Sequence, residues 1–232
     1  DEQAQRYTLT LSQTCPATPG QADKQPFVIP VAMGLLAADG SELLAEQLLV
    51  LDTAQHTWAF EGLGKAPVPS LLRGFSAPVR LDDDLSDTDR LVLLAHDRDP
   101  FNRWEAGQKL MLDRLLAAVA SGQAPVLDDA LAAALRHTLN DRTLDPAFKT
   151  LVLTVPSELY IAEQLPAVDP QRIHAVREQW RVLMAHHLHA DWAAAWEANQ
   201  VSAGYAPKPE QSGPRALANL ALKMLCLHAV RA

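Results

Sequence analysis

The spacing of apolar residues changes once along this chain, near His96, and this change constrains the fold more than any other feature. Before it, apolar residues alternate with polar ones or form short runs broken by Pro and Gly, which is the pattern of β-strands. In the segment Tyr7 to Leu11, for example, every second residue is large and apolar, so one face of the strand is dry. After His96, apolar residues recur at steps of three and four, as on one face of a helix. The sequence therefore predicts two domains, all-β over residues 1–96 and all-α over residues 97–232.

The first domain is expected to be an Ig-like antiparallel β-sandwich, because short strands separated by turns at this spacing are typical of that fold. Turns are predicted at residues 38–40 and 62–64. The acidic run at residues 82–84 is predicted to be a solvated turn between the last two strands, since it lacks the spaced oxygen ligands of a calcium loop. The predicted strands are Tyr7–Leu11, Phe27–Leu36, Gln47–Leu51, Thr57–Phe60, Leu71–Leu81 and Leu91–Ala95.

The second domain is expected to be an α-solenoid or helical-repeat segment, because amphipathic helices follow one another with no strands between them. Three Asp-Pro pairs, at residues 99–100, 145–146 and 169–170, predict helix starts. In each pair Asp can accept a backbone N–H as N-cap, and Pro lacks an N–H that would be unpaired anyway. Besides the helix that follows Asp99-Pro100, helices are predicted over residues 127–139 and 148–155, after Pro156, over 173–196, and from about Ser212 to the C-terminus.

The charge and composition of the chain narrow its partners. A formal net charge of -8 and a pI near 5.4 leave no basic surplus for a phosphate backbone, which argues against nucleic acid. No window of about 18 apolar residues and no secretory signal is present, so we expect no membrane partner and a cytoplasmic location. Cys15 and Cys226 lie far apart in the sequence, and we expect two free thiols.

No motif in the sequence identifies an active site. His186, His187 and His189 are clustered, but neighbouring helical residues are about 100° apart, so we expect them to point in different directions and to bind no metal. The sequence contains no H-E-x-x-H motif, nucleophile elbow or phosphate-binding loop. It therefore assigns no catalytic or metal-ligating residue and leaves substrate-binding residues unknown. Four tryptophans fall on the apolar helix faces and are expected in the core: Trp104, Trp180, Trp192 and Trp196.

Several stretches, in the same order along the chain, resemble bacterial aminopeptidase N. The first stretches resemble the β-sandwich domain that follows the catalytic domain in that family, and the later ones resemble its helical C-terminal domain. The resemblance covers almost the whole chain. The matching stretches are YTLTLSQ (7–13), PATPGQ (16–21), KQPF (24–27), IPV (29–31), PSLLRGFSAPV (69–79), Asp99 with FNRWEA (101–106), PSE (156–158), AE (162–163), VDP (168–170) and RAL (215–217) with Asn219-Leu220.

This resemblance implies that the parent protein is a zinc aminopeptidase, which releases N-terminal amino acids from peptides. In that family zinc is held by H-E-x-x-H and a more distant Glu, and a Gly-Ala-Met-Glu-Asn stretch binds the amino terminus of the substrate. Neither motif occurs in this chain. The resemblance therefore implies an inactive portion whose zinc belongs to a missing catalytic domain. It makes residues 1–96 a spacer and residues 97–232 the first part of a helical bowl that caps the catalytic chamber.

The expected partners are the missing catalytic domain, later C-terminal helices of the same polypeptide, and peptide substrates of the parent. The alternative is a free-standing β-sandwich and helical-repeat module that binds another protein. An enzyme with an unrecognised site ranks third. The last helical pattern has no stop signal, which predicts that the polypeptide continues. Self-association or fraying is therefore expected through the apolar residues of the last helix: Leu217, Leu220, Met224, Leu225 and Leu227.

Overall fold

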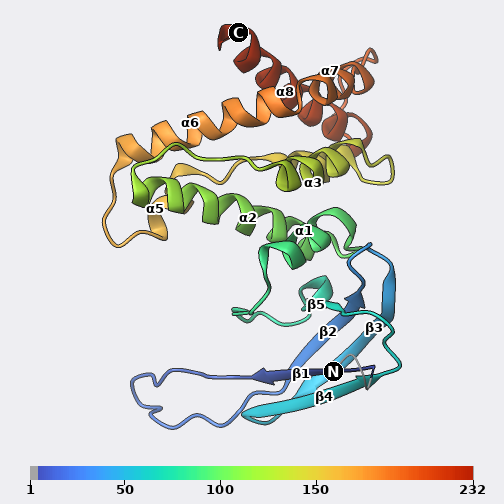
Figure 1. Ribbon diagram of the computed structural model, residues 1–232, viewed down its shortest axis with the longest axis vertical. Helices are drawn as coiled ribbons and strands as arrows, with labels where there is room; N and C mark the ends of the chain where they lie inside the picture. Colours follow the sequence, from blue (N-terminus) through green and yellow to red (C-terminus); the bar gives the residue numbers. More distant parts are fainter. Residues whose placement is uncertain (1–4, 232) are drawn as a thin grey trace. The chain divides into compact units, whose positions relative to one another are not determined.

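The computed structural model describes residues 5–231 and divides into two compact units (Figure 1). The first unit runs to Asn102 and the second begins at Arg103. An Ig-like β domain is followed by a helical repeat domain, as the sequence predicts. The division at residues 96 and 97 stays a prediction.

The first unit contains two antiparallel sheets. One pairs β1 with β4, and the other has the order β3-β2-β5. The alternation of side chains along each strand places apolar residues on the faces that pack together. The central pairs show this register: Leu9 lies opposite Trp58, and Val31 opposite Leu49. The strands are β1 (Arg6–Ser12), β2 (Ile29–Leu36), β3 (Glu42–Leu51), β4 (Gln55–Glu61) and β5 (Val68–Leu71).

The core of the β domain is built from both sheets. The strand β1 contributes its alternate residues, as predicted, and β2 contributes three large side chains that are almost fully enclosed. The turn at residues 38–40 is confirmed, and it needs Gly40 because the backbone there has a φ of 81°. The buried residues of this core are Leu9, Val31, Met33, Leu35, Leu49, Leu71, Leu72 and Ala77.

Two predicted strands of the first domain are wrong. The segment Leu71–Leu81 stops being a strand at Leu71, because Leu72 turns the chain with a φ of 57° and the 3-10 helix η1 (Arg73–Phe75) follows. The segment Leu91–Ala95 is part of helix α1 (Asp87–His96). A short apolar run fits a buried strand or a buried helix equally well, and here the helix start decides. Because α1 replaces a strand, the acidic run at residues 82–84 precedes a helix and does not join two strands.

A capping box opens α1. Ser86 accepts a hydrogen bond from the backbone N–H of Asp89, and the Asp89 side chain accepts one from the backbone N–H of Ser86. Two backbone N–H groups that would otherwise be unpaired are satisfied in this way. The pattern Ser-x-x-Asp was the available sequence signal for this helix.

Helices follow without strands from α2 to the end of the described chain. The predicted Asp-Pro starts are confirmed: Asp99, Asp145 and Asp169 each accept a backbone N–H in the first turn of the helix that follows. In the second unit α4, α6 and α7 all pack against α8. The helices are α2 (Pro100–Ser121), α3 (Asp129–Asn140), α4 (Pro146–Leu153), α5 (Glu158–Glu163), α6 (Pro170–His187), α7 (His189–Ala198) and α8 (Pro209–Arg231).

The long helix predicted over residues 173–196 is two helices. The chain leaves helical geometry at Leu188, whose φ is -114° and ψ 23°, and this residue is fully buried. The apolar face of α8 is also more enclosed than expected. Leu217 and Met224 are buried. Among the described residues of this helix, the exposed large apolar side chain is that of Leu222. Self-association through this helix stays a prediction.

Candidate functional site

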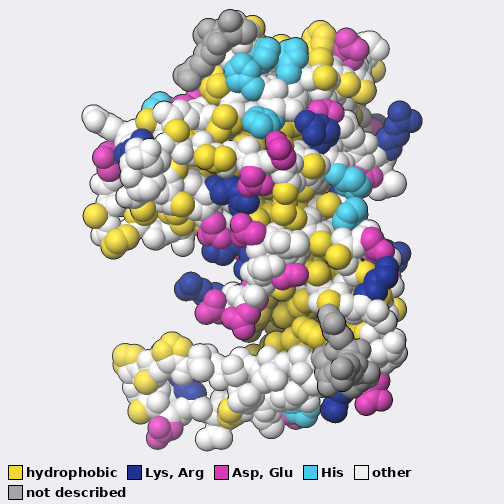
Figure 2. All heavy atoms as spheres, in the orientation of Figure 1, with side chains coloured by type: hydrophobic (Ala, Val, Ile, Leu, Met, Phe, Trp, Pro, Cys, Tyr) yellow, Lys and Arg dark blue, Asp and Glu magenta, His cyan; other side chains and the backbone are white. Residues whose placement is uncertain are grey.

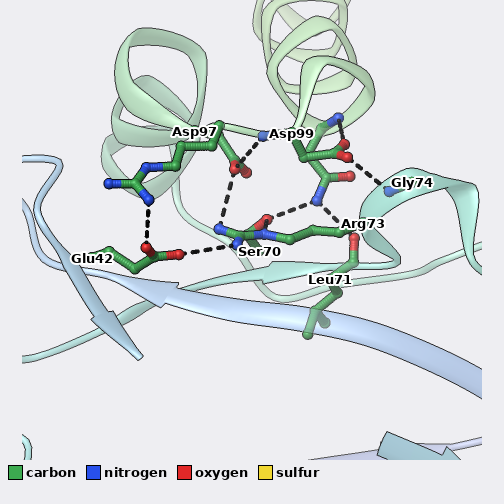
Figure 3. A network of polar contacts seen from close by, with 9 residues as sticks. Glu42, Ser70, Leu71, Arg73, Gly74, Asp97 and Asp99 are labelled. Atoms are coloured by element: carbon green, nitrogen blue, oxygen red, sulfur yellow. Dashed lines mark hydrogen bonds and ion pairs between the residues drawn. The ribbon is translucent and has the colours of Figure 1, made fainter. Parts of the chain in front are cut away.

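The described residues contain no group of three His, Cys, Asp or Glu side chains that could hold a metal ion. The feature of the first unit that concentrates buried polar groups is a network around Arg73, which joins the sheet β3-β2-β5 to the end of α1 and the first turn of α2 (Figure 3). We call it the Arg73 network. Its members are Glu42, Ser70, Leu71, Arg73, Gly74, Asp97, Arg98, Asp99 and Asn102.

Arg73 is the centre of the network, and its guanidinium has a partner on each nitrogen. Nε donates to the Ser70 hydroxyl at 2.8 Å, while Nη1 and Nη2 each lie 3.3 Å from a carboxylate oxygen, of Glu42 and Asp97 respectively. The side chain is only 5% exposed, so these contacts replace water almost completely. A guanidinium suits this place because its donors have a fixed fork geometry and it keeps its charge when buried.

Asp97 is the other buried charge of the network. Its side chain is fully enclosed, and its Oδ1 accepts hydrogen bonds from Arg73 and from the backbone N–H of Asp99. Its Oδ2 has no hydrogen-bond partner among the described residues. Burial raises the pKa of this carboxyl, and the hydrogen bonds and the Arg73 charge offset that rise only in part. The pair Arg73–Asp97 is therefore held together at the cost of desolvating both charges.

Asp99 and Asn102 attach the start of α2 to the same network. Asp99 accepts from the backbone N–H of Asn102 at 2.8 Å and from that of Gly74 at 2.7 Å. The Asn102 amide donates to the Ser70 hydroxyl and to the Leu71 carbonyl, both at 2.8 Å. The helix cap and the turn after β5 are thus tied by the same carboxylate. These hydrogen bonds fix the first turn of α2 on the β domain. Their role is therefore structural.

Gly34 gives the Arg73 network a testable weak point. A Cβ atom at this position would lie 2.5 Å from the Arg73 Cζ, so the guanidinium would have to leave its partners. We expect Gly34→Ala to lower the free energy of unfolding by about 1–3 kcal/mol, as overpacking does in other cores. Urea denaturation measures this. The matched control is Gly64→Ala, where no heavy atom lies within 4 Å of the added methyl, and an equal loss in both variants would contradict the steric argument.

The histidines that the sequence singled out are only partly separated. His187 is exposed and its carbonyl accepts a hydrogen bond from Arg136. The rings of His186 and His189, however, both lie against His228 of α8. The expectation that all three point in different directions is therefore wrong for this pair, because their spacing of three residues places them on one side of the α6–α7 junction. No sequence signal linked His228 to them.

The structure also tests the predictions for the tryptophans and the cysteines, and it confirms only some of them. Trp180 and Trp192 are fully buried, Trp104 is half-buried, and Trp196 is 37% exposed, so core packing is wrong for Trp196. Both cysteines are free, as the sequence predicts, and both are exposed. Over the described part of the chain, no helix combines the length and hydrophobicity needed to cross a membrane.

Two family models together match almost the whole chain. Residues 1–84 match a domain of unknown function with an Ig-like fold (DUF3458), and residues 87–232 match a domain of unknown function with ARM repeats (DUF3458_C). The chain belongs to the DUF3458_C family, whose model matches more than half of it. The limits of the two DUF3458 matches lie on either side of the capping residue of α1.

Relatives of this DUF3458 chain confirm the resemblance to bacterial aminopeptidase N. It is 42% identical to a protein of Caulobacter vibrioides named Aminopeptidase N, over 84% of this chain and 22% of that protein. It is 36% identical to Aminopeptidase N of Escherichia coli, over 96% of this chain and 27% of that protein. A solved structure of Legionella pneumophila aminopeptidase A in complex with aspartic acid has a TM-score of 0.83, with 26% identity over the whole chain and 27% of that chain.

The chain thus spans about a quarter of the length of the relatives that it matches. Their other three quarters have no counterpart in it. The chain is homologous to a non-catalytic region of the aminopeptidase N family.

Proposed function

We propose that this chain is the spacer and helical cap of a zinc aminopeptidase. The rest of the same polypeptide would supply the catalytic domain and later helices, and the substrates would be peptides with a free amino terminus. The proposal includes a cytoplasmic location. The observation that carries it is the match, over 84% and 96% of this chain, to about a quarter of the length of proteins named Aminopeptidase N.

The described residues of this chain do not fit a zinc site. A catalytic zinc needs three protein ligands that converge on one point, and no such group occurs among residues 5–231. We therefore derive no catalytic step from this chain. Its contribution is mechanical: the Arg73 network supports the start of α2, and the helices that follow would restrict the access of substrates to a chamber formed elsewhere in the polypeptide.

A chimera tests this proposal. The matching segment of Escherichia coli Aminopeptidase N is replaced by this chain, and hydrolysis of an aminoacyl chromogenic substrate is measured for the chimera and for the isolated chain. We expect turnover in the chimera and none in the isolated chain, because the zinc ligands come from the other part. Deleting the helices of the second unit from the chimera is expected to narrow the difference in rate between short and long peptides.

Two outcomes would contradict the proposal. Turnover by the isolated chain that survives purification and is blocked by a chelator would show a catalytic site within it. A chimera that is folded and binds zinc but is inactive would favour the free-standing interaction module.

A further inference from the structure

Three imidazole rings gather where the ends of three helices of the second unit meet. His186 belongs to the last turn of α6, His189 opens α7, and His228 lies near the end of α8. The ring centroids of His186 and His228 are 4.5 Å apart, and those of His189 and His228 are 3.9 Å apart. Figure 2 shows histidine side chains gathered on the face in view. We call these three residues the histidine cluster.

His228 is the most enclosed member of the histidine cluster. It is half-buried, and its Nδ1 is enclosed without a hydrogen-bond partner among the described residues. Burial lowers the pKa of this imidazole, and the neighbouring His189 and His186 lower it further. A second proton on His228 would therefore lie on or beside an enclosed nitrogen, against the rings of His186 and His189.

Among the described side chains, no carboxylate is a charge partner of His228. The electrostatic partners of His228 among the described side chains are His186 of α6 and His189 of α7. Asp191 of α7 is engaged by Arg136 and by the Asn140 amide of α3. The titratable group of α4, the third helix packed on α8, is Lys149, whose charged neighbours are Asp141 and Arg103.

We propose that protonation of the histidine cluster releases the end of α8 from α6 and α7, so that this end is docked near neutral pH and loosened below about pH 6. The sign follows from linkage. A lowered pKa in the docked state means that the released state binds protons more readily, so docking is at full strength above the ordinary imidazole pKa and weakens as the pH falls through it. The ring planes of the histidine cluster are tilted or edge-to-face, and no group that could hold a metal ion occurs among the described residues, which makes a metal site the poorer explanation.

Hydrogen exchange over residues 222–229, measured with a chelator at about pH 7.5 and about pH 5.5 and corrected for intrinsic rates, tests the proposal. We expect a several-fold loss of protection at the lower pH there and no comparable loss in α3. His228→Gln and His189→Gln should each reduce this loss. The matched control is His187→Gln, next to the cluster but outside it, which should behave as the unchanged chain does.

Three results would overturn the proposal. The first is protection of α8 that is independent of pH. The second is a loss that persists in both His228→Gln and His189→Gln. The third is a loss of α8 protection at the lower pH that occurs only in samples containing zinc and not in samples with the chelator, which would identify a metal site. Because His189 is exposed, His189→Gln remains informative if His228→Gln alone disturbs the packing of α8.

Discussion

Replacing Arg73 with Met is expected to lower the free energy of unfolding of the β domain by about 3–5 kcal/mol, the usual cost of removing one partner of a buried ion pair. The variant leaves the fully enclosed Asp97 carboxylate without its cation and the Ser70 hydroxyl without one of its donors. Because a domain of this kind has only about 5–15 kcal/mol to lose, a large part of its stability depends on this side chain. Denaturation in urea, with hydrogen exchange in β2 and β5 as a local measure, determines the loss.

The pH dependence of the Arg73→Met variant separates a charge effect from a packing effect. Burial already raises the pKa of Asp97, so the folded variant takes up a proton at higher pH than the unfolded chain. The free energy of unfolding that the variant loses, relative to the unchanged chain, should therefore be largest above the raised pKa of Asp97. This loss should become smaller as the pH falls toward the ordinary carboxyl range. The double variant Arg73→Met with Asp97→Asn should recover much of the loss at neutral pH. A deficit that is the same at all pH values would show that lost packing is responsible.

The exposed ion pair between Lys65 and Asp39 is the control for these measurements. Both side chains are 57% exposed, so the free energy of unfolding should fall far less in Lys65→Met than in Arg73→Met. A cost as large as that of Arg73→Met would mean that the buried network has no special weight in the stability of the domain.

Local signals in the sequence predicted the parts of the fold that local chemistry decides. The Asp-Pro pairs predicted three helix starts because the cap and the missing N–H act within one turn. The alternation in β1 predicted which of its faces is buried. The apolar spacing does not reveal helix α1, because the run Leu91–Ala95 is apolar without a period, although the capping pair Ser86 and Asp89 marks the start of the helix.

The Arg73 network and the histidine cluster could not be predicted, because each joins residues that are far apart in the sequence: Glu42 and Asp97 with Arg73, and His228 with His186 and His189. Glu42 and Asp97 meet at Arg73 only after β5 and α1 are in place, and each of these residues taken alone looks like an ordinary surface charge. The sequence around the helix break at Leu188 contains no Gly or Pro that would predict it. Tertiary packing decides it, since Leu188 is fully buried.

Trp192→Ala is expected to lower the free energy of unfolding of the helical unit by about 3–5 kcal/mol, as truncation of a fully buried aromatic ring does. The ring is completely enclosed, and its Nε1 donates to the Met184 carbonyl at 3.1 Å, so the side chain holds α7 to the end of α6 across the break. Trp196, one turn further along the same helix and 37% exposed, gives a control with the same residue type and the same truncation. Trp196→Ala should cost about 1 kcal/mol, because much of its ring already meets water. Thermal unfolding of the two variants, followed by circular dichroism at the helical band, measures the difference. Equal losses would mean that both rings are enclosed, as the spacing of the sequence alone suggests.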